Sequence, residues 1–360
     1  MSEDSTGTTD RSASHANVRR AEDPTKAILS QSDLNKKYLC DYVINVATGC
    51  SHGCKFCYVP STPNIRARPN MLNEEVGVED AQEEWGSYVL YRDHIPDELP
   101  GILDRKQKWK HTDRGCGIVG ISFGTDCYMD PRAGAITTSV VEALTTRDRY
   151  ARVLTRNPVL AAQDMETFIE AGDHVIVGSS INSLDSEAVR AIETSAPGPN
   201  HRLRGLQKFA SNDVPVYVSM SPTYPTMGED DIRELIEELA ALNPRVVFHE
   251  PINPRGGNFQ MTVDAAWAAG QDELGAALAS LRDEDTWVEY ALTQFYWVQK
   301  IAEELDVPIH LWPDKQLINN VSGEYERWLE AWFGRQSPEE FAGRDTPDED
   351  FPTLPSRPDM

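Results

Sequence analysis

The stretch from Gly49 to Tyr58 reads GCSHGCKFCY, and its cysteines decide how the rest of the chain is interpreted. Cys50, Cys54 and Cys57 follow the spacing C-x3-C-x2-C. Three thiolates on one short loop can ligate three irons of a cubane [4Fe-4S] cluster. The fourth iron is then open to the amine and carboxylate of one amino acid. The two glycines of the stretch let the backbone wrap tightly around such a cluster.

Two other kinds of metal site compete with this interpretation. A structural zinc ion takes four ligands, usually as two closely spaced pairs of Cys or His. The sequence has no second pair, so the fourth ligand would have to be His52, inside the loop, or a distant cysteine. A ferredoxin-type cluster would also need a fourth cysteine, which Cys40 could supply. The first alternative describes a zinc-stabilised binding module, and the second an electron-transfer protein.

Short apolar runs alternate with helical patterns through the middle of the chain. Such runs are expected for strands buried on both faces, and their alternation with helices is typical of a parallel sheet built from βαβ units. The six predicted strands are Tyr42–Ala47, Gly117–Phe123, Arg152–Thr155, His174–Ile181, Val214–Met220 and Arg245–His249. One more short apolar run, Pro308–Trp312, follows later.

Helical patterns fill the gaps between these strands. The clearest is Asp231–Leu242, with leucines and isoleucines on one face and glutamates on the other. Weaker patterns cover Ser139–Thr146, Val159–Glu170 and Arg202–Ala210, and a long helical stretch covers Val263–Glu304. The count favours an α/β fold, a partial (β/α)6 TIM-type barrel, over a complete eight-fold one. The predicted parts are a core at 29–258, a helical C-terminal extension at 259–335, and disordered tails at 1–28 and 336–360, the second acidic and Pro-rich.

Polar residues follow the predicted strands at their carboxyl ends. Chemistry in such folds is placed at this edge of the sheet, so these segments are expected to meet in one site. They are Gly124-Thr125-Asp126-Cys127, Thr155-Arg156-Asn157, Ser179-Ser180-Ile181-Asn182, Ser219-Met220-Ser221-Pro222 and His249-Glu250-Pro251-Ile252-Asn253.

With these pieces in place, the sequence resembles the radical S-adenosylmethionine (SAM) superfamily. Its signature is C-x3-C-x-aromatic-C after the first strand, and Phe56 fills the aromatic position. Within the superfamily the chain is similar to the spore photolyase-related group from about Tyr42 to Asn258. The similar pieces beyond the cysteine loop are Gly124-Thr125-Asp126 followed by Tyr128 and Pro131, Thr155-Arg156-Asn157-Pro158, Ser179–Leu184, and Glu250-Pro251 with Pro254-Arg255-Gly256.

The resemblance implies two cofactors, a [4Fe-4S] cluster on Cys50, Cys54 and Cys57, and SAM on the open iron. It implies cleavage of SAM to a 5'-deoxyadenosyl radical that abstracts hydrogen from the substrate. The cofactors supply this chemistry and the protein orients and shields them. By position, the resemblance implies cofactor contacts from Phe56, near the adenine, and from Tyr58, Gly124, Thr125, Asp126, Ser180, Asn182 and Glu250.

Several of these positions have plainer interpretations. The usual Gly-Gly-Glu run against the SAM amino group is absent here, and Asp126 is the candidate for its carboxylate; it is also a residue type that ends turns and caps helices. Ser180 and Asn182, candidates for the ribose hydroxyls, are also helix-capping types. Cys127 is the catalytic candidate, a thiol that returns hydrogen to the product radical, although a buried free cysteine is usually packing. Cys40 and Cys116 lie at the other ends of the first two strands.

The chain carries a net charge of −24, from 58 acidic and 34 basic residues. An acidic surface weakens binding to nucleic acid, or it keeps a protein hydrated in a salty cytoplasm. The acid is spread over helices, loops and both tails, which favours the second, halophilic interpretation. No apolar run approaches the length of a membrane helix, and the N-terminus has no apolar signal segment, so a cytoplasmic location is expected.

Residues 105–114 form the most basic stretch of this acidic chain. Trp109 stands among Arg105, Lys106, Lys108 and Lys110, so it could stack a base while the cations meet phosphates. The alternative is a solvated loop with the tryptophan tucked against the body. A nucleic-acid partner is therefore one hypothesis, and chemistry on a base would require flipping. A reductant such as a ferredoxin or flavodoxin is the other partner that the resemblance implies.

Overall fold

A mostly parallel sheet of eight strands lies at the centre of the fold, in the order β11-β10-β9-β8-β7-β6-β3-β2. All neighbours are parallel except the antiparallel edge strand β2. The computed structural model describes residues 18–32, 34, 39–110, 117–335 and 351–358. The strands are β2 (Ser30–Gln31), β3 (Tyr42–Ile44), β6 (Ile118–Ile121), β7 (Tyr150–Leu154), β8 (Val175–Ser180), β9 (Val216–Thr223), β10 (Val247–Pro251) and β11 (Ile309–Leu311).

The sheet confirms the predicted α/β fold, a partial TIM-type barrel. Every predicted strand contributes to it, and the later run Pro308–Trp312 adds β11 as a seventh parallel strand beside β10. The first predicted strand, however, covers two elements. β3 ends at Ile44, and the chain then joins a second, three-stranded sheet as β4 (Ala47–Gly49).

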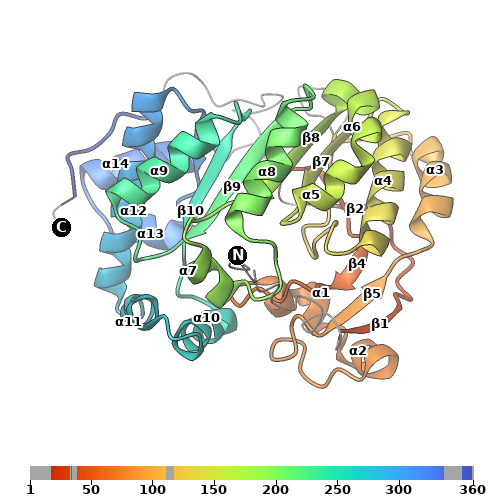
Figure 1. The fold of residues 1–360 in the computed structure, drawn as a ribbon, viewed down its shortest axis with the longest axis horizontal. Coiled ribbons are helices and arrows are strands. Elements are labelled where there is room, and N and C mark those ends of the chain that lie inside the picture. Colours follow the sequence, from red (N-terminus) through yellow and green to blue (C-terminus); the bar gives the residue numbers. More distant parts are fainter. Residues whose placement is uncertain (1–17, 33, 35–38, 111–116, 336–350, 359–360) are drawn as a thin grey trace, which may run out of the picture.

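Helices cover the outer face of the sheet, as Figure 1 shows. α4, α5, α6 and α8 gather beside β7 and β8, while α9, α12 and α14 lie beside β10. The helices are α1 (Pro63–Arg66), α2 (Pro69–Val76), α3 (Ile95–Arg105), α4 (Pro131–Thr145), α5 (Pro158–Ala161), α6 (Met165–Ala171), α7 (Ser186–Ile192), α8 (Pro199–Ala210), α9 (Glu229–Ala240), α10 (Gly257–Ala268), α11 (Asp272–Ser280), α12 (Glu284–Leu305), α13 (Lys315–Asn319) and α14 (Glu324–Gly334). Short 3-10 turns are η2 (Val59–Ser61), η3 (Ala162–Asp164) and η4 (Gly172–His174).

The long helical stretch predicted over Val263–Glu304 is three helices, α10, α11 and α12. The first break falls at Gly270, whose φ of +74° is a left-handed conformation that ends helices and favours glycine. The second break precedes Asp283, whose side chain accepts a hydrogen bond from the Thr286 amide and caps α12.

The prediction of a disordered tail over 1–28 is wrong for its last part. Strand β1 (Arg19–Glu22) pairs in parallel with β5 (Tyr88–Tyr91) in the small sheet. The buried Asp23 carboxylate then accepts hydrogen bonds from Thr48 Oγ1 at 2.6 Å and from Arg92 Nε at 2.9 Å. These polar residues bind the segment through partners distant in sequence. Residues 1–17 lie outside the described part.

The second predicted tail, 336–360, is also ordered in part. The Phe351 ring lies 5.8 Å from that of Trp332, and the Pro352 carbonyl accepts a hydrogen bond from Gln299 at 2.5 Å. Residues 351–358 therefore pack against α12 and α14, because the aromatic and proline residues of this segment find a surface there. Residues 336–350 and 359–360 lie outside the described part.

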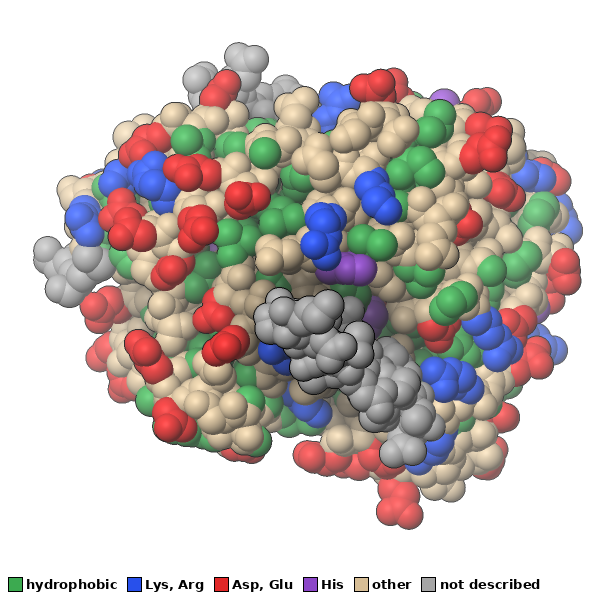
Figure 2. Space-filling model, in the orientation of Figure 1, with side chains coloured by type: hydrophobic (Ala, Val, Ile, Leu, Met, Phe, Trp, Pro, Cys, Tyr) green, Lys and Arg blue, Asp and Glu red, His purple; other side chains and the backbone are tan. Residues whose placement is uncertain are grey.

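Side chains alternate between the two faces of each strand. On β9, Val216, Val218 and Met220 belong to the large core under the helices, whereas Tyr217 belongs to a smaller core on the inner face. The inner core also contains Cys40, Ile118, Ile176 and Phe248. Figure 2 shows acidic side chains distributed over one face of the molecule. In the described ranges, no helix has the length and apolar character that a membrane crossing requires.

Candidate functional site

Strand β4 delivers the chain directly into the cysteine loop, and two glycines set the path of that loop. Gly49 has φ +87°, and a Cβ there would lie 2.3 Å from the Tyr88 carbonyl oxygen. Gly53 has φ +60°, and its Cβ would lie 3.0 Å from the Cα of Gly86. The backbone is therefore pressed against β5 and the turn before it, where only glycine fits. The tight path of the loop is set by these contacts, and the wrapping of the loop around a cluster stays a prediction.

The three cysteines open onto one cavity of about 560 Å³ at the carboxyl ends of the strands. Cys50 and Cys54 are buried, Cys57 is half-buried, and all three are free thiols. The predicted residues Phe56, Tyr58, Thr125, Asp126, Ser180 and Glu250 also line this cavity. The structure therefore brings together segments from five parts of the chain, which is the arrangement expected for strand ends of a parallel sheet.

Three predicted site residues do not line the cavity. The Gly124 amide donates to Asn45 Oδ1 at 2.9 Å, and the fully buried Asn182 donates to the Pro222 carbonyl at 3.0 Å. Cys127 is fully buried in the outer core, with Sγ 3.4 Å from the Leu154 carbonyl oxygen. Burial raises the pKa of Cys127 well above its usual value. This placement matches a packing role and gives no support to hydrogen donation.

Asp126 ties the cysteine loop to the ends of β6 and β7. Its Oδ1 accepts hydrogen bonds from the Tyr128 amide at 2.8 Å and Thr155 Oγ1 at 2.7 Å. Its Oδ2 accepts one from the Arg156 amide at 2.6 Å and lies 3.4 Å from His52 Nε2. Burial opposes ionisation, but His52 and these hydrogen bonds lower the pKa of Asp126 to about 2. Because protein groups occupy both carboxylate oxygens, the geometry favours a positioning role for Asp126 over direct contact with SAM. Its hydrogen bond with the Tyr128 amide forms a turn, which is the alternative interpretation given to this residue from the sequence.

A buried charge cluster that the sequence did not indicate lies behind Cys54. The Oε2 atom of Glu193 accepts hydrogen bonds from Arg156 and Arg202, and lies 4.0 Å from the Sγ atom of Cys54. Glu193 and Arg202 are fully buried, whereas Arg156 lines the cavity. Burial alone would raise the pKa of Glu193, but the charges and hydrogen bonds of the two arginines outweigh burial and lower the pKa below its usual value. The carboxyl therefore stays ionised. The sequence did show a basic residue, Arg156, directly after the third predicted strand. It did not show that Arg156 pairs with Glu193.

Arg156 also contacts the aromatic residue of the motif. Its guanidinium carbon lies 5.0 Å from the centre of the Phe56 ring, within the range of a cation–π interaction. A fixed cation therefore stands beside the cysteines, at a cavity wall that is otherwise largely apolar. A ligand carboxylate at this wall would meet a guanidinium that the Glu193 cluster already holds in place.

Three free thiols on one loop that line one cavity fit the corners of a cubane cluster. Within the described residues, no three His, Cys, Asp or Glu side chains are gathered closely enough to hold a single metal ion. Burial raises the pKa of Cys54 to about 12 and that of Cys57 to about 11. Bound iron would replace these protons, and a cubane accepts sulfurs that are spread over its corners. Cys40 does not line the cavity.

The described part of the basic stretch lies at the opposite end of the strands. The Trp109 ring packs edge-on against Tyr42, the first residue of β3, with ring centres 5.1 Å apart. Its Nε1 donates to the Lys106 carbonyl, and Arg149 lies over its face at 4.5 Å. The tryptophan is therefore tucked against the body, far along the strands from the cysteine loop. Residues 111–114 of the stretch lie outside the described part.

Comparisons with known proteins place the chain in a family. The chain is 28% identical to an uncharacterized protein of Acidianus two-tailed virus, over 72% of this chain and 83% of that one. It is 25% identical to an uncharacterized protein of Methanocaldococcus jannaschii, over 52% of this chain and 61% of that one. The structure is similar to a mutant of spore photoproduct lyase with bound AdoMet and dinucleoside spore photoproduct, at a TM-score of 0.48 and 15% identity, over 74% of this chain and 72% of that one.

The model of the radical SAM superfamily matches residues 44–239. This range begins in β3, includes all three cysteines of the motif, and runs through β9 to α9. It covers more than half of the 360 residues. The chain therefore belongs to the radical SAM superfamily.

Proposed function

We propose that this protein cleaves SAM reductively at a [4Fe-4S] cluster held by Cys50, Cys54 and Cys57, and abstracts hydrogen from a substrate. The observation that carries the proposal is the opening of three free thiols onto one cavity beside a fixed guanidinium. When bound, the cluster and SAM together supply a 5'-deoxyadenosyl radical. The residues of the chain bind, orient and shield these groups.

Arg156 and Phe56 form the proposed SAM-binding wall. The Arg156 guanidinium attracts the carboxylate of the methionine end, because Glu193 and Arg202 fix its orientation before SAM arrives. Phe56 presents an aromatic face for the adenine, and Ser180 a hydroxyl for the ribose. Asp126 acts through its neighbours, since it holds Thr155 and the Arg156 backbone in place.

The cavity wall also shields the chemistry from water. Val59, Trp85, Pro222 and Ile252 line it together with the polar groups. A radical that abstracts hydrogen needs such a wall, because an enclosed apolar site prevents side reactions.

The proposal includes partners and conditions. A buried cluster must receive one electron, so the proposed electron donor is a small reductant such as a ferredoxin or flavodoxin. We also propose, from the composition of the sequence, a cytoplasmic location and a halophilic host. Nucleic-acid lesions are one candidate class of substrate. The described part of the basic stretch lies at the other end of the strands and does not support that class.

The deciding experiment is anaerobic. The protein is reconstituted with iron and sulfide, reduced with dithionite, given SAM, and assayed for 5'-deoxyadenosine, with Cys54→Ala as the control. Formation by the wild type alone is the expected result. A verified reduced cluster that yields no cleavage product would instead favour an electron-transfer protein, and binding of zinc in place of iron would contradict the proposal.

A further inference from the structure

Two hydrogen bonds between backbone groups hold the turn from Cys54 to Cys57. The Cys57 amide donates to the Cys54 carbonyl at 3.1 Å, which closes the turn. The Lys55 amide donates at 3.0 Å to the carbonyl of Ile192, the last residue of α7. The first half of the turn is therefore tied to the helix that ends directly before Glu193.

A side chain of helix α10 holds the second half of the turn. Asn258, the second residue of α10, donates from Nδ2 to the carbonyl of Phe56, which lies 202 residues earlier in the chain. Asn258 is half-buried and lines the cavity that the three cysteines also line. Gly256 has φ +104°, and a Cβ there would lie 2.8 Å from Asn258 Oδ1. The approach of the amide to the turn therefore depends on a bare backbone just before α10.

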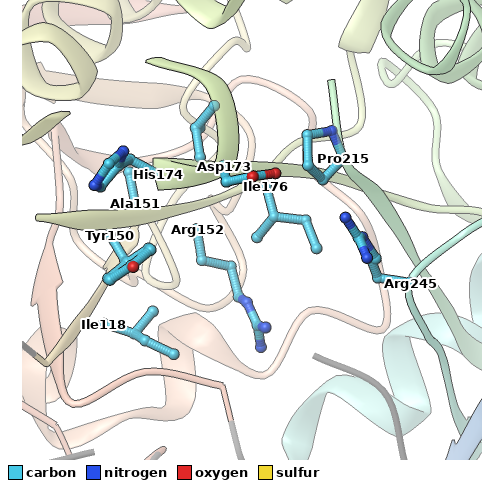
Figure 3. A pocket seen from close by; sticks show the side chains of 10 residues that line it. Ile118, Tyr150, Ala151, Arg152, Asp173, His174, Ile176, Pro215 and Arg245 are labelled. Carbon is cyan, nitrogen blue, oxygen red and sulfur yellow. The ribbon is translucent and has the colours of Figure 1, made fainter. Parts of the chain in front are cut away.

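Helix α10 lies at the cysteine end of the barrel and beyond residues 44–239, which match the superfamily. Asn258, Phe259 and Thr262 line the cavity of the cysteines. The ten residues that line a second cavity, of about 210 Å³ at the amino ends of the strands, all precede β10; Arg152 and His174 are among them (Figure 3). Helix α10 also packs against α7, so the two elements that hold the turn support each other.

Phe56 is consequently held at two points. Its ring lies 5.0 Å from the Arg156 guanidinium carbon, and its carbonyl accepts the bond from Asn258. The same peptide unit contains the Cys57 amide, which the Cys54 carbonyl accepts. Because both polar groups of this unit are bonded, the unit cannot rotate without breaking a hydrogen bond.

We infer that Asn258 is a positioning residue of the cysteine turn, which makes α10 a part of the candidate site. The inference rests on the proposed function, in which Cys54 and Cys57 ligate the cluster and Phe56 faces the adenine. By fixing the peptide unit between Phe56 and Cys57, the amide sets the direction of the ring and of the thiol. Groups that orient ligands from behind in this way tune the affinity and the reduction potential of a metal site.

The first test uses the full chain before the cluster is added. Asn258→Leu keeps the size of the side chain and removes the donor, while Gln260→Leu makes the same kind of change at an exposed position of α10 and is the matched control. Hydrogen exchange is measured in peptides that cover residues 50–58. Exchange of this loop is expected to be about fivefold faster in Asn258→Leu, the effect of one lost hydrogen bond, and unchanged in Gln260→Leu.

The second test uses the same proteins after anaerobic reconstitution. Asn258→Leu is expected to bind SAM about tenfold more weakly than the wild type, and to shift the midpoint potential of the cluster, followed by EPR. A residue that only stabilises the fold would not shift this potential. Gln260→Leu is expected to match the wild type in both measurements.

Each outcome decides the inference. Faster exchange of the loop together with weaker SAM binding, a shifted potential or loss of the cluster supports it. Unchanged exchange of the loop, or unchanged affinity and potential in a loaded Asn258→Leu, would overturn it. Tighter SAM binding would also overturn it, because the amide would then compete with SAM for the Phe56 carbonyl. Formation of 5'-deoxyadenosine by the wild type tests the proposed function separately, and the exchange measurement needs no cluster, so the two failures are distinguishable.

Discussion

Glu193 holds Arg156 against the cysteine loop, with one carboxylate oxygen that accepts a hydrogen bond from Arg156 and lies 4.0 Å from Cys54 Sγ. Arg202 donates to the same oxygen from behind at 2.5 Å. The buried Glu193 and Arg202 and the partly buried Arg156 thus form one group of charges behind Cys54, and only Arg156 reaches the cavity. Such outer groups orient the groups that touch a cofactor.

Removing the charge of Glu193 is expected to weaken SAM binding. In Glu193→Gln the Arg156 guanidinium loses its anchor, and we expect the SAM dissociation constant to rise about tenfold or more. Equilibrium binding to the reconstituted protein measures this constant. The midpoint potential of the cluster, followed by EPR, is expected to shift as well, which a merely structural residue would not cause. Glu187→Gln, exposed on helix α7, which ends directly before Glu193, is the control.

Breaking a buried ion pair also destabilises a protein, so Glu193→Gln needs a second variant. Arg156→Lys keeps a cation and a smaller hydrogen-bonding capacity, and should fold while binding SAM less tightly, because lysine cannot pair bidentately with a carboxylate. Unchanged SAM affinity and potential in both folded variants would contradict the role given to this cluster of charges.

Substituting single cysteines tests whether three or four of them ligate the proposed cluster. Cys40 is buried in the inner core and does not line the cavity, so Cys40→Ala is expected to retain iron and sulfide at the wild-type level. Cys54→Ala is expected to lose most of both, because one corner of the cubane loses its ligand. Iron and acid-labile sulfide are measured after anaerobic reconstitution. Loss of the cluster in Cys40→Ala would favour the ferredoxin-type alternative.

Much of the fold could be predicted from the sequence, for a physical reason. Strands buried on both faces read as short apolar runs, and the seven runs are seven parallel strands. The strands that were not predicted are β1, β2 and β5; β5 (Tyr88–Tyr91) is a buried, largely apolar run that was passed over, whereas β1 and β2 are polar. β1 is the polar segment Arg19–Glu22, which is a strand only because β5 lies beside it. Arg20 is the register partner of Val89, 69 residues further along the chain. A local sequence pattern cannot indicate so distant a partner.

The residues of the candidate site also differ in whether local sequence could predict them. Residues on one loop or directly after a strand, such as Cys54 and Ser180, were predicted because spacing and topology place them. Asn182 and Cys127 also follow strands, but their side chains point away from the cavity. A difference of one position reverses the face of a side chain near a strand end. Glu193 and Arg202 were missed because their charges meet only after α7 and α8 pack.

The N-terminal segment makes a prediction about pH. Burial opposes ionisation of Asp23, but hydrogen bonds from Thr25 and Thr48 and the charge of Arg92 lower its pKa below the usual value. Its contribution to stability is therefore present above the unfolded pKa of about 3.9, and is lost as the pH falls through the lower, folded pKa. Asp23→Asn leaves Arg92 without its carboxylate partner, and is expected to lower the free energy of unfolding by about 3 kcal/mol at neutral pH.

Denaturant unfolding at a series of pH values measures this difference. It is expected to shrink toward pH 3, where the wild-type carboxyl also begins to take a proton. Asp97→Asn, in the first turn of α3, is the control for an acidic residue without a buried partner. Equal stability of Asp23→Asn and the wild type at pH 7 would show that residues 19–23 add little to the fold.

The packing of the Tyr217 ring against Gly178 of β8 can be tested without any ligand. Gly178→Ala places a methyl group within 2.3 Å of the Tyr217 ring, which is held between two strands and cannot swing aside freely. Overpacking of this kind typically costs about 1–3 kcal/mol. Thermal unfolding should therefore shift to lower temperature in Gly178→Ala, and hardly at all in Gly198→Ala, where a Cβ meets nothing within 4 Å. A Gly178→Ala variant as stable as the wild type would mean that the ring has room to move.

The net charge of −24 predicts a dependence on salt. Acidic side chains spread over the surface repel one another in the folded state, and at 1 M salt the screening length falls to about 3 Å. The midpoint of thermal unfolding should therefore rise as KCl increases to molar levels, and sorbitol at equal osmolality should not reproduce the full rise. The triple variant Glu234→Gln, Glu237→Gln and Glu238→Gln, which neutralises the exposed face of α9, should be more stable than the wild type at low salt and gain less from KCl. Unfolding of the wild type in molar KCl would contradict the halophilic interpretation, because repulsion between surface carboxylates would then not be what limits stability.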